Sequence, residues 1–442
     1  MPFHAATTLK MPLPFLLYLA LLVTTASSIR AVEIADPNLE SSIRKTLGKT
    51  DGDLSLEDMR SLTDLDASYT SRRMPGATPP LIRSLEGLET ATNLRFLDLS
   101  GQCLESDQDC HTNVDIFDLF VLETLTSLEH LDLSNNDLTE VFLPDDMTNL
   151  SALILRGNAL NEFEIPRGMS NLKTLDLSLN HLGTLNLPSD LLDLRTLMIE
   201  SNRLNHLDIP ESIKNLTDLD ISDNRLHSLV LHSGLTNLTV LDLEHNEFNS
   251  FAIPNELSKL HTVQLGSNRL SSLFLPETLP HLTTLRLDGN RLNSLDLPAK
   301  LPSLETLDLS QNDLEQISYF ESGKNLRHIL APSNLLTQFS IPSDATKLLT
   351  LDFSMNPIEL LLVPLGLDLE SLDLRGIERS QITVYGGIAI ARSSDGIEIS
   401  WTDGTLQSAA TVDGPWTDIP TNGNRHSASL SESHVFFRTK RD

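Results

Sequence analysis

The sequence predicts an α/β solenoid, in which short parallel strands form a concave sheet and each coil returns through an extended segment. The first observation behind this prediction is an asparagine that recurs every 22 residues. A repeat held in register over so many copies indicates stacked coils, because a single coil cannot bury its own apolar face. These asparagines, called the asparagine ladder below, are Asn136, Asn158, Asn180, Asn202, Asn224, Asn246, Asn268, Asn290, Asn312, Asn334 and Asn356.

The second observation is the phrase L-x-x-L-x-L-x-x-N-x-L around each asparagine, as in the segment from Leu282 to Leu292. Leu285 and Leu287 are two residues apart, so in a strand both side chains point to one face, toward the core. The asparagine follows where the chain turns away from the sheet. Its amide has donors and an acceptor, and it can therefore bond main-chain groups that a turn leaves unpaired.

The third observation is a Leu-Pro or Ile-Pro pair seven and eight residues after most ladder asparagines, as in Leu187-Pro188 and Ile209-Pro210. Proline has no N–H and a fixed φ, which disfavours a regular helix. The return half of each coil is therefore predicted to be extended or polyproline-like.

These residues and spacings resemble the leucine-rich repeat proteins of the short bacterial kind, and the repeat length is similar to that of the internalins. The resemblance covers residues 33–380. It implies a leucine-rich repeat horseshoe with a small helical N-terminal cap, and an exported, non-catalytic protein that binds another protein.

The chain is predicted to comprise a signal peptide (1–31), an N-terminal cap (32–93), about 13 repeats (94–380) and a C-terminal β module (381–442). Lys10 precedes an apolar run from Met11 to Val23, and small residues follow. A run of this length is short for a bilayer span and is typical of a signal peptide. Cleavage is expected between Ala26 and Ala31, with no transmembrane segment afterwards. The mature protein is then secreted, at the cell surface or in the periplasm; an uncleaved anchor is the alternative.

The cap is predicted to contain two short helices. Asp36 can cap the first helix, Pro37 suits its first turn and Gly48 can end it. Ser55 is expected to start the second, with Asp58 three residues later as a weak capping box. The order of these elements is similar to the cap of internalin-like proteins, which covers the apolar end of a solenoid.

An insertion follows the first full phrase, in which Gln102 takes the asparagine position and the next copy comes 34 residues later. The inserted segment contains the two cysteines of the chain, Cys103 and Cys110. In an exported protein such a pair predicts a disulfide. A metal site that uses these cysteines and His111 is the alternative, but it lacks further ligands.

The candidate binding site is the exposed face of the concave sheet. Aspartate recurs at the middle exposed position of the strands through Asp373, which the repeat phrase alone accounts for, whereas departures from the phrase indicate a ligand. Carboxylates, amides and apolar anchors on neighbouring strands suit a protein or peptide partner with basic residues. The alternatives are a solvated face without a ligand, or calcium bound by the carboxylates. The candidate partner-binding residues are Ile154, Asp176, Met198, Glu200, Asp220, Asp242, Glu244, Gln264, Arg286 and Asp288.

A second irregularity is Pro332, which follows Ala331 at the end of a predicted strand. Proline cannot donate to a sheet, so the strand is expected to end early or to bulge there.

The C-terminal segment from Gln381 has a different composition, with both tryptophans and alternating runs separated by Asp-Gly and Asn-Gly. Such runs predict strands and turns, and the segment resembles small β-sandwich modules at the ends of secreted bacterial proteins. It is expected to cap the solenoid or to attach it to a surface.

Composition and motifs narrow the function. With 61 acidic and 32 basic residues the net charge is -29, which argues against nucleic acid as a partner. No catalytic, phosphate-binding or dinucleotide motif is present, so no enzyme activity, cofactor or metal is predicted. A binding protein is favoured; the alternative is an envelope-associated scaffold that spaces its C-terminal module.

Overall fold

The computed structural model describes residues 31–69, 81–102, 116–145, 147–317 and 323–364. Farther along the chain it describes 373–375, 382–385, 388–393, 396–401, 405–409, 416–419, 425–428 and 436–440. The signal sequence before Ala31 lies outside these residues, as do Cys103 and Cys110 with their predicted disulfide.

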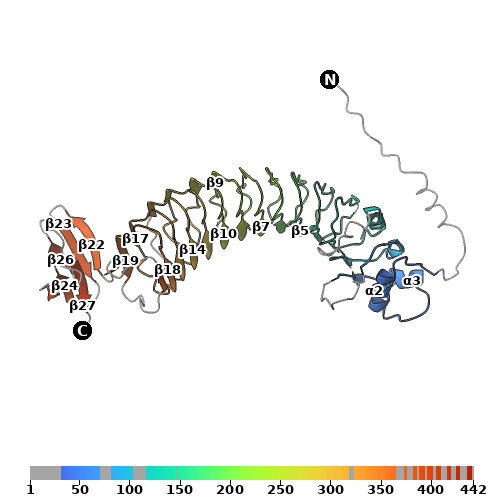
Figure 1. Ribbon diagram of the computed structural model, residues 1–442, viewed down its shortest axis with the longest axis horizontal. Helices are drawn as coiled ribbons and strands as arrows, with labels where there is room; N and C mark the ends of the chain where they lie inside the picture. Colours follow the sequence, from blue (N-terminus) through green and yellow to red (C-terminus); the bar gives the residue numbers. More distant parts are fainter. Residues whose placement is uncertain are drawn as a thin grey trace, which may run out of the picture.

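The repeats stack into a curved solenoid whose inner edge is one parallel sheet of 14 strands within the described chain (Figure 1). Neighbouring strands pair with the 22-residue offset of the repeats, as in Thr262 opposite Thr284. The offset is 34 residues across the predicted insertion, where Phe96 pairs with His130. The strands are β1 (Asp64–Asp66), β2 (Phe96–Asp98), β3 (His130–Asp132), β4 (Ala152–Ile154), β5 (Thr174–Asp176), β6 (Thr196–Met198), β7 (Asp218–Asp220), β8 (Val240–Asp242), β10 (Thr262–Gln264), β12 (Thr284–Arg286), β14 (Thr306–Asp308), β16 (His328–Leu330), β18 (Thr350–Asp352) and β20 (Asp373–Arg375).

The core is a continuous column of leucine and isoleucine side chains that runs from Ile34 to Val363. In each coil the middle residue of the strand and the residue just after it point inward, as Leu197 and Ile199 do, and both are fully buried. The two side chains of each strand that point the other way are left for the concave face.

The asparagine ladder lies just beyond the strands and bonds to main chain. Asn246 shows the pattern: its Nδ2 donates to the carbonyl oxygens of Leu243 (3.2 Å) and Ile221 (2.9 Å), and its Oδ1 accepts the N–H of Leu226 (3.0 Å). Each amide thus ties its own turn to the preceding coil. At the first position the longer Gln102 reaches the cap, donating to Ala67 O and accepting from Ile82 N.

The N-terminal cap closes one end of the solenoid with helices α2 (Pro37–Leu47) and α3 (Leu56–Ser61) (Figure 1). Asp36 Oδ1 accepts from Asn38 N (2.8 Å) and Leu39 N (3.1 Å), and α2 ends at Gly48 with φ 65°. Ser55 and Asp58 form the predicted capping box of α3. Both helices are therefore confirmed. Two 3-10 helices, η1 (Leu88–Thr90) and η3 (Ile116–Thr124), follow before the regular repeats.

The return segments between residues 125 and 364 contain no helix where the structure describes them, which confirms the extended return. Some of them also pair on the outer edge of the arc, where β9 is seen in Figure 1, a feature that the proline pattern did not predict. These parallel sheets contain β9 (Ser250–Ala252) with β11 (Ser272–Phe274), β13 (Ser294–Leu295) with β15 (Gln316–Ile317), and β17 (Gln338–Ser340) with β19 (Leu360–Pro364) and β21 (Ile382–Tyr385).

Two local predictions about the sheet are wrong. Strand β16 before Pro332 keeps its full three residues and pairs in regular register on both sides. The proline is tolerated because the N–H at this position does not donate to the sheet: in other coils it bonds the aspartate two residues earlier, as Ser310 N bonds Asp308 Oδ1. Asp373 pairs with Thr350, so the last offset is one residue longer and Arg375 takes the middle exposed position.

The C-terminal strands after β21 form two antiparallel three-stranded sheets beyond the last coil (Figure 1). Strand β21 itself pairs with β19, so residues 382–385 belong to the outer edge of the solenoid, although the predicted module begins at 381. The two sheets contain β22 (Ile388–Ser393), β23 (Gly396–Trp401) and β26 (Arg425–Ala428), and β24 (Thr405–Ala409), β25 (Thr417–Asp418) and β27 (Phe436–Lys440).

Candidate functional site on the concave face

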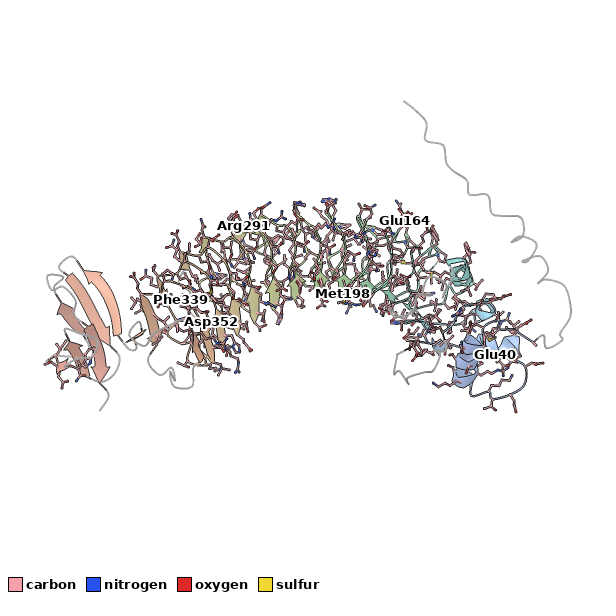
Figure 2. The ribbon with its side chains drawn as sticks, in the orientation of Figure 1. Glu40, Glu164, Met198, Arg291, Phe339 and Asp352 are labelled. Atoms are coloured by element: carbon pink, nitrogen blue, oxygen red, sulfur yellow. The ribbon has the colours of Figure 1, made fainter. Side chains whose placement is uncertain are left out.

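The candidate residues gather where strands β6, β7, β8, β10 and β12 end. The paired register places the last residues of these strands side by side, and the residues two positions later form a second row. We call this surface the central patch; it comprises Met198, Asp220, Asp242, Gln264 and Arg286 in the first row and Glu200, Glu244 and Asp288 in the second. Met198 lies on the inner edge of the arc, whereas Glu164 lies on the outer edge (Figure 2).

The aspartates of the first row also have a local structural role. Asp220 Oδ1 accepts from the N–H (3.0 Å) and the hydroxyl (2.7 Å) of Ser222, which follows the end of the strand. Asp176 makes the same bond to Ser178 N (2.9 Å) and is only 8% exposed. Among the predicted binding residues, Asp176 therefore offers a ligand little surface.

Arg286 lies between two carboxylates of the second row. Its Nη1 is 3.5 Å from Glu244 Oε1 and its Nη2 is 3.5 Å from Asp288 Oδ1. Both oxygens are buried and make no hydrogen bond in the described structure. Gly266 separates the two carboxylates and makes room for them, because a Cβ there would lie 2.7 Å from Asp288 Oδ1. These ion pairs are longer than a charge-assisted hydrogen bond.

Asp242 carries the strongest electrostatic perturbation of the patch. Its carboxylate accepts from Glu244 N (3.0 Å) and from the amide of Gln264 on the next strand. Burial, reinforced by the negative charges of Asp220 and Glu244, raises the pKa of Asp242 to about 6. Burial also raises the pKa of Glu244, although Arg286 opposes the shift. Negative charge is therefore costly here, and a cation brought to the patch would relieve that cost.

One contact of the site was not predicted from the sequence. Arg156, on the coil of β4, reaches across the intervening coil to Glu200, with 3.1 Å between Nη1 and Oε2. Since repeats stack in register, an arginine and a glutamate two repeats apart in one column are the signal that could have revealed this pair. Glu200 is thus partly neutralised, while Asp220 and Asp242 accept hydrogen bonds from uncharged donors.

The apolar part of the candidate site lies at its N-terminal side. Met198 ends β6 next to Asp220, and Ile154 ends β4, with Asp176 between the two in the row. Both apolar side chains are partly exposed. The face thus combines an apolar margin with an acidic centre. Over the described residues, no group of three or more histidine, cysteine or acidic side chains could hold a metal ion.

Three stretches of the chain match known repeat families. Residues 107–226 match the BspA type leucine rich repeat region (6 copies), residues 237–260 match the Leucine Rich Repeat, and residues 280–321 match Leucine Rich repeats (2 copies). The chain is a leucine-rich repeat protein. It matches no curated protein.

Solved structures place this leucine-rich repeat protein beside the internalins in fold. The functional domain of InlJ from Listeria monocytogenes superimposes with a TM-score of 0.63 at 21% identity, over 81% of this chain and 73% of that one. The internalin InlF from Listeria monocytogenes gives a TM-score of 0.51 at 18% identity, over 81% of this chain and 99% of that one. The solenoid is therefore internalin-like. None of the helices in the described regions has the length and apolar character needed to cross a membrane.

Proposed function

We propose that this leucine-rich repeat protein is an exported, non-catalytic recognition protein that binds a protein or peptide with basic residues through its concave face. The central patch carries the proposal. It contains more carboxylates than cations, since Arg286 is shared by Glu244 and Asp288 and Arg156 serves Glu200 alone. The export part rests on the N-terminal sequence.

The cost of buried negative charge explains why the ligand should be cationic. Glu244 is only 16% exposed as a side chain, and the pKa of Asp242 is raised to about 6. A lysine or arginine of a partner would supply the charge that these groups lack and would compete with Arg286 for two buried oxygens. Met198 and Ile154 would hold an apolar side chain beside it, as interface cores do.

A selection from phage-displayed peptides tests this proposal while the natural partner is still unidentified. The mature chain is immobilised, and enriched peptides are expected to carry lysine or arginine next to an apolar residue. Their binding should be lost in the double variant Glu200→Lys, Glu244→Lys. The control is Glu164→Lys, the same charge change on the outer edge (Figure 2); it should bind like the wild type. Peptides without basic residues, or peptides that the double variant still binds, would contradict the proposal.

The alternative function, a scaffold that spaces its C-terminal module, is favoured by the separate antiparallel sheets after β21. It makes a different prediction. Attachment to the cell surface would then depend only on residues 381–442 and would be unaffected by the double variant on the concave face. Recognition is favoured because the central patch departs from the repeat phrase.

A further inference from the structure

A second site candidate lies on the flank of the solenoid, where the chain leaves strands β5, β6 and β7. A groove of about 420 Å³ opens there between three consecutive coils. Its basic lining comes from His181, Arg203 and Arg225, each the residue just after a ladder asparagine, and all three are exposed. Ser201 and Asp223 add a hydroxyl and a carboxylate.

The two arginines of this groove have no carboxylate partner among the described residues. The same column shows what happens when one is available: farther along, Arg269 Nη1 lies 2.7 Å from Glu247 Oε2. Asp223, the carboxylate at the groove, lies 3.8 Å from His245 Nδ1 instead. Unpaired guanidinium groups are unexpected in a chain whose net charge is -29.

The spacing of the coils suits one anionic group. Arg203 and Arg225 are on neighbouring coils, and neighbouring strands lie about 4.8 Å apart. Two like charges at such a separation repel each other. A tetrahedral oxyanion between them removes that repulsion and can accept charge-assisted hydrogen bonds from both guanidinium groups.

We propose that this groove binds a small organic oxyanion, namely the phosphate or sulfate ester of a sugar. The volume lies in the range of small-molecule sites, about 300–1,000 Å³. Ser201 and Asp223 are then available to the hydroxyl groups of the sugar. A large polyanion is disfavoured because the negative field of the whole protein repels it. This site is independent of the proposed partner surface, since its residues lie outside the central patch.

Isothermal titration calorimetry on the mature chain tests the proposal with three probes: glucose 6-phosphate, galactose 6-sulfate and glucose. Saturable binding of the phosphate ester, the sulfate ester or both supports it and identifies the anion. Glucose should give no heat of binding. The affinity should fall as salt is added, because exposed charges are screened. Absence of binding by both esters, or equal binding of glucose, overturns the proposal.

The variant Arg203→Ala, Arg225→Ala should weaken binding of the ester about tenfold or more, since two charge-assisted bonds are lost. Arg291→Ala is the matched control: Arg291 occupies the same column four coils beyond Arg203, is exposed, and lies outside the groove. Its binding should equal that of the wild type. The proposal is wrong if the double variant retains the wild-type affinity or if Arg291→Ala loses as much. Thermal melts verify that both variants fold; should the alanine pair fail, Arg203→Lys, Arg225→Lys keeps the charge and should still weaken binding.

Discussion

Replacement of a single ladder asparagine in mid-solenoid should destabilise the protein strongly. In Asn246→Ala, the N–H of Leu226 and the carbonyl oxygens of Ile221 and Leu243 lose their partner inside the core. A buried polar group left without a hydrogen bond costs about 1–3 kcal/mol. Allowing for partial relaxation, the free energy of unfolding should fall by about 3–5 kcal/mol. Asn246→Asp should be worse still at neutral pH, because it brings a buried carboxylate to two carbonyl oxygens.

Urea denaturation followed by far-ultraviolet circular dichroism measures this loss. Tryptophan fluorescence is unsuitable, since Trp401 and Trp416 both lie after the repeats. Asn249→Ala is the control, because Asn249 lies three residues along the same coil and is exposed; a surface change of this kind should stay within about 0.5 kcal/mol. A loss below about 1 kcal/mol for Asn246→Ala would refute the reasoning, since it would mean that the ladder bonds are replaceable by water.

Three further changes test the cap and the central patch. Asp36→Ala removes two capping bonds and the bond from Arg83 N (2.7 Å) to Asp36 Oδ2, and should cost about 2 kcal/mol in urea denaturation; an unchanged midpoint would contradict it. The pKa of Asp242 is raised from 3.8 to about 6, so its contribution to stability is present below pH 4 and is lost as the pH rises through 6. Relative to Asp242→Asn, the wild type should therefore lose stability between about pH 4 and 7, and parallel pH profiles would refute this. Gly266→Ala places a Cβ 2.7 Å from Asp288 Oδ1 and should displace that carboxylate; weaker binding of selected basic peptides by calorimetry is expected, and unaltered affinity would contradict the assigned role.

The solenoid could be predicted from the sequence because its constraints are periodic. A 22-residue repeat requires neighbouring strands to pair 22 residues apart, as Thr262 and Thr284 do. The insertion predicted after Gln102 reappears as a single longer offset. Local chemistry also determines the cap, since Asp36 and Ser55 satisfy N–H groups of their own helices.

Features that depend on contacts between coils could not be predicted in the same way. The pair of Arg156 and Glu200 spans two repeats, and the burial of Asp242 depends on its neighbours in the sheet. The register of Asp373 differs from the prediction because the last offset contains an extra residue, which the leucine phrase does not reveal. Pro332 leaves its strand intact because the N–H that proline lacks is not used by the sheet.

Photo-crosslinking tests the central claim, recognition through the concave face, most directly. A photoreactive p-benzoylphenylalanine replaces Met198 on the inner edge or Glu164 on the outer edge (Figure 2), and each variant is irradiated with a selected basic peptide. Recognition through the concave face predicts a covalent adduct from position 198 and none from position 164. An adduct from position 164 alone would contradict it.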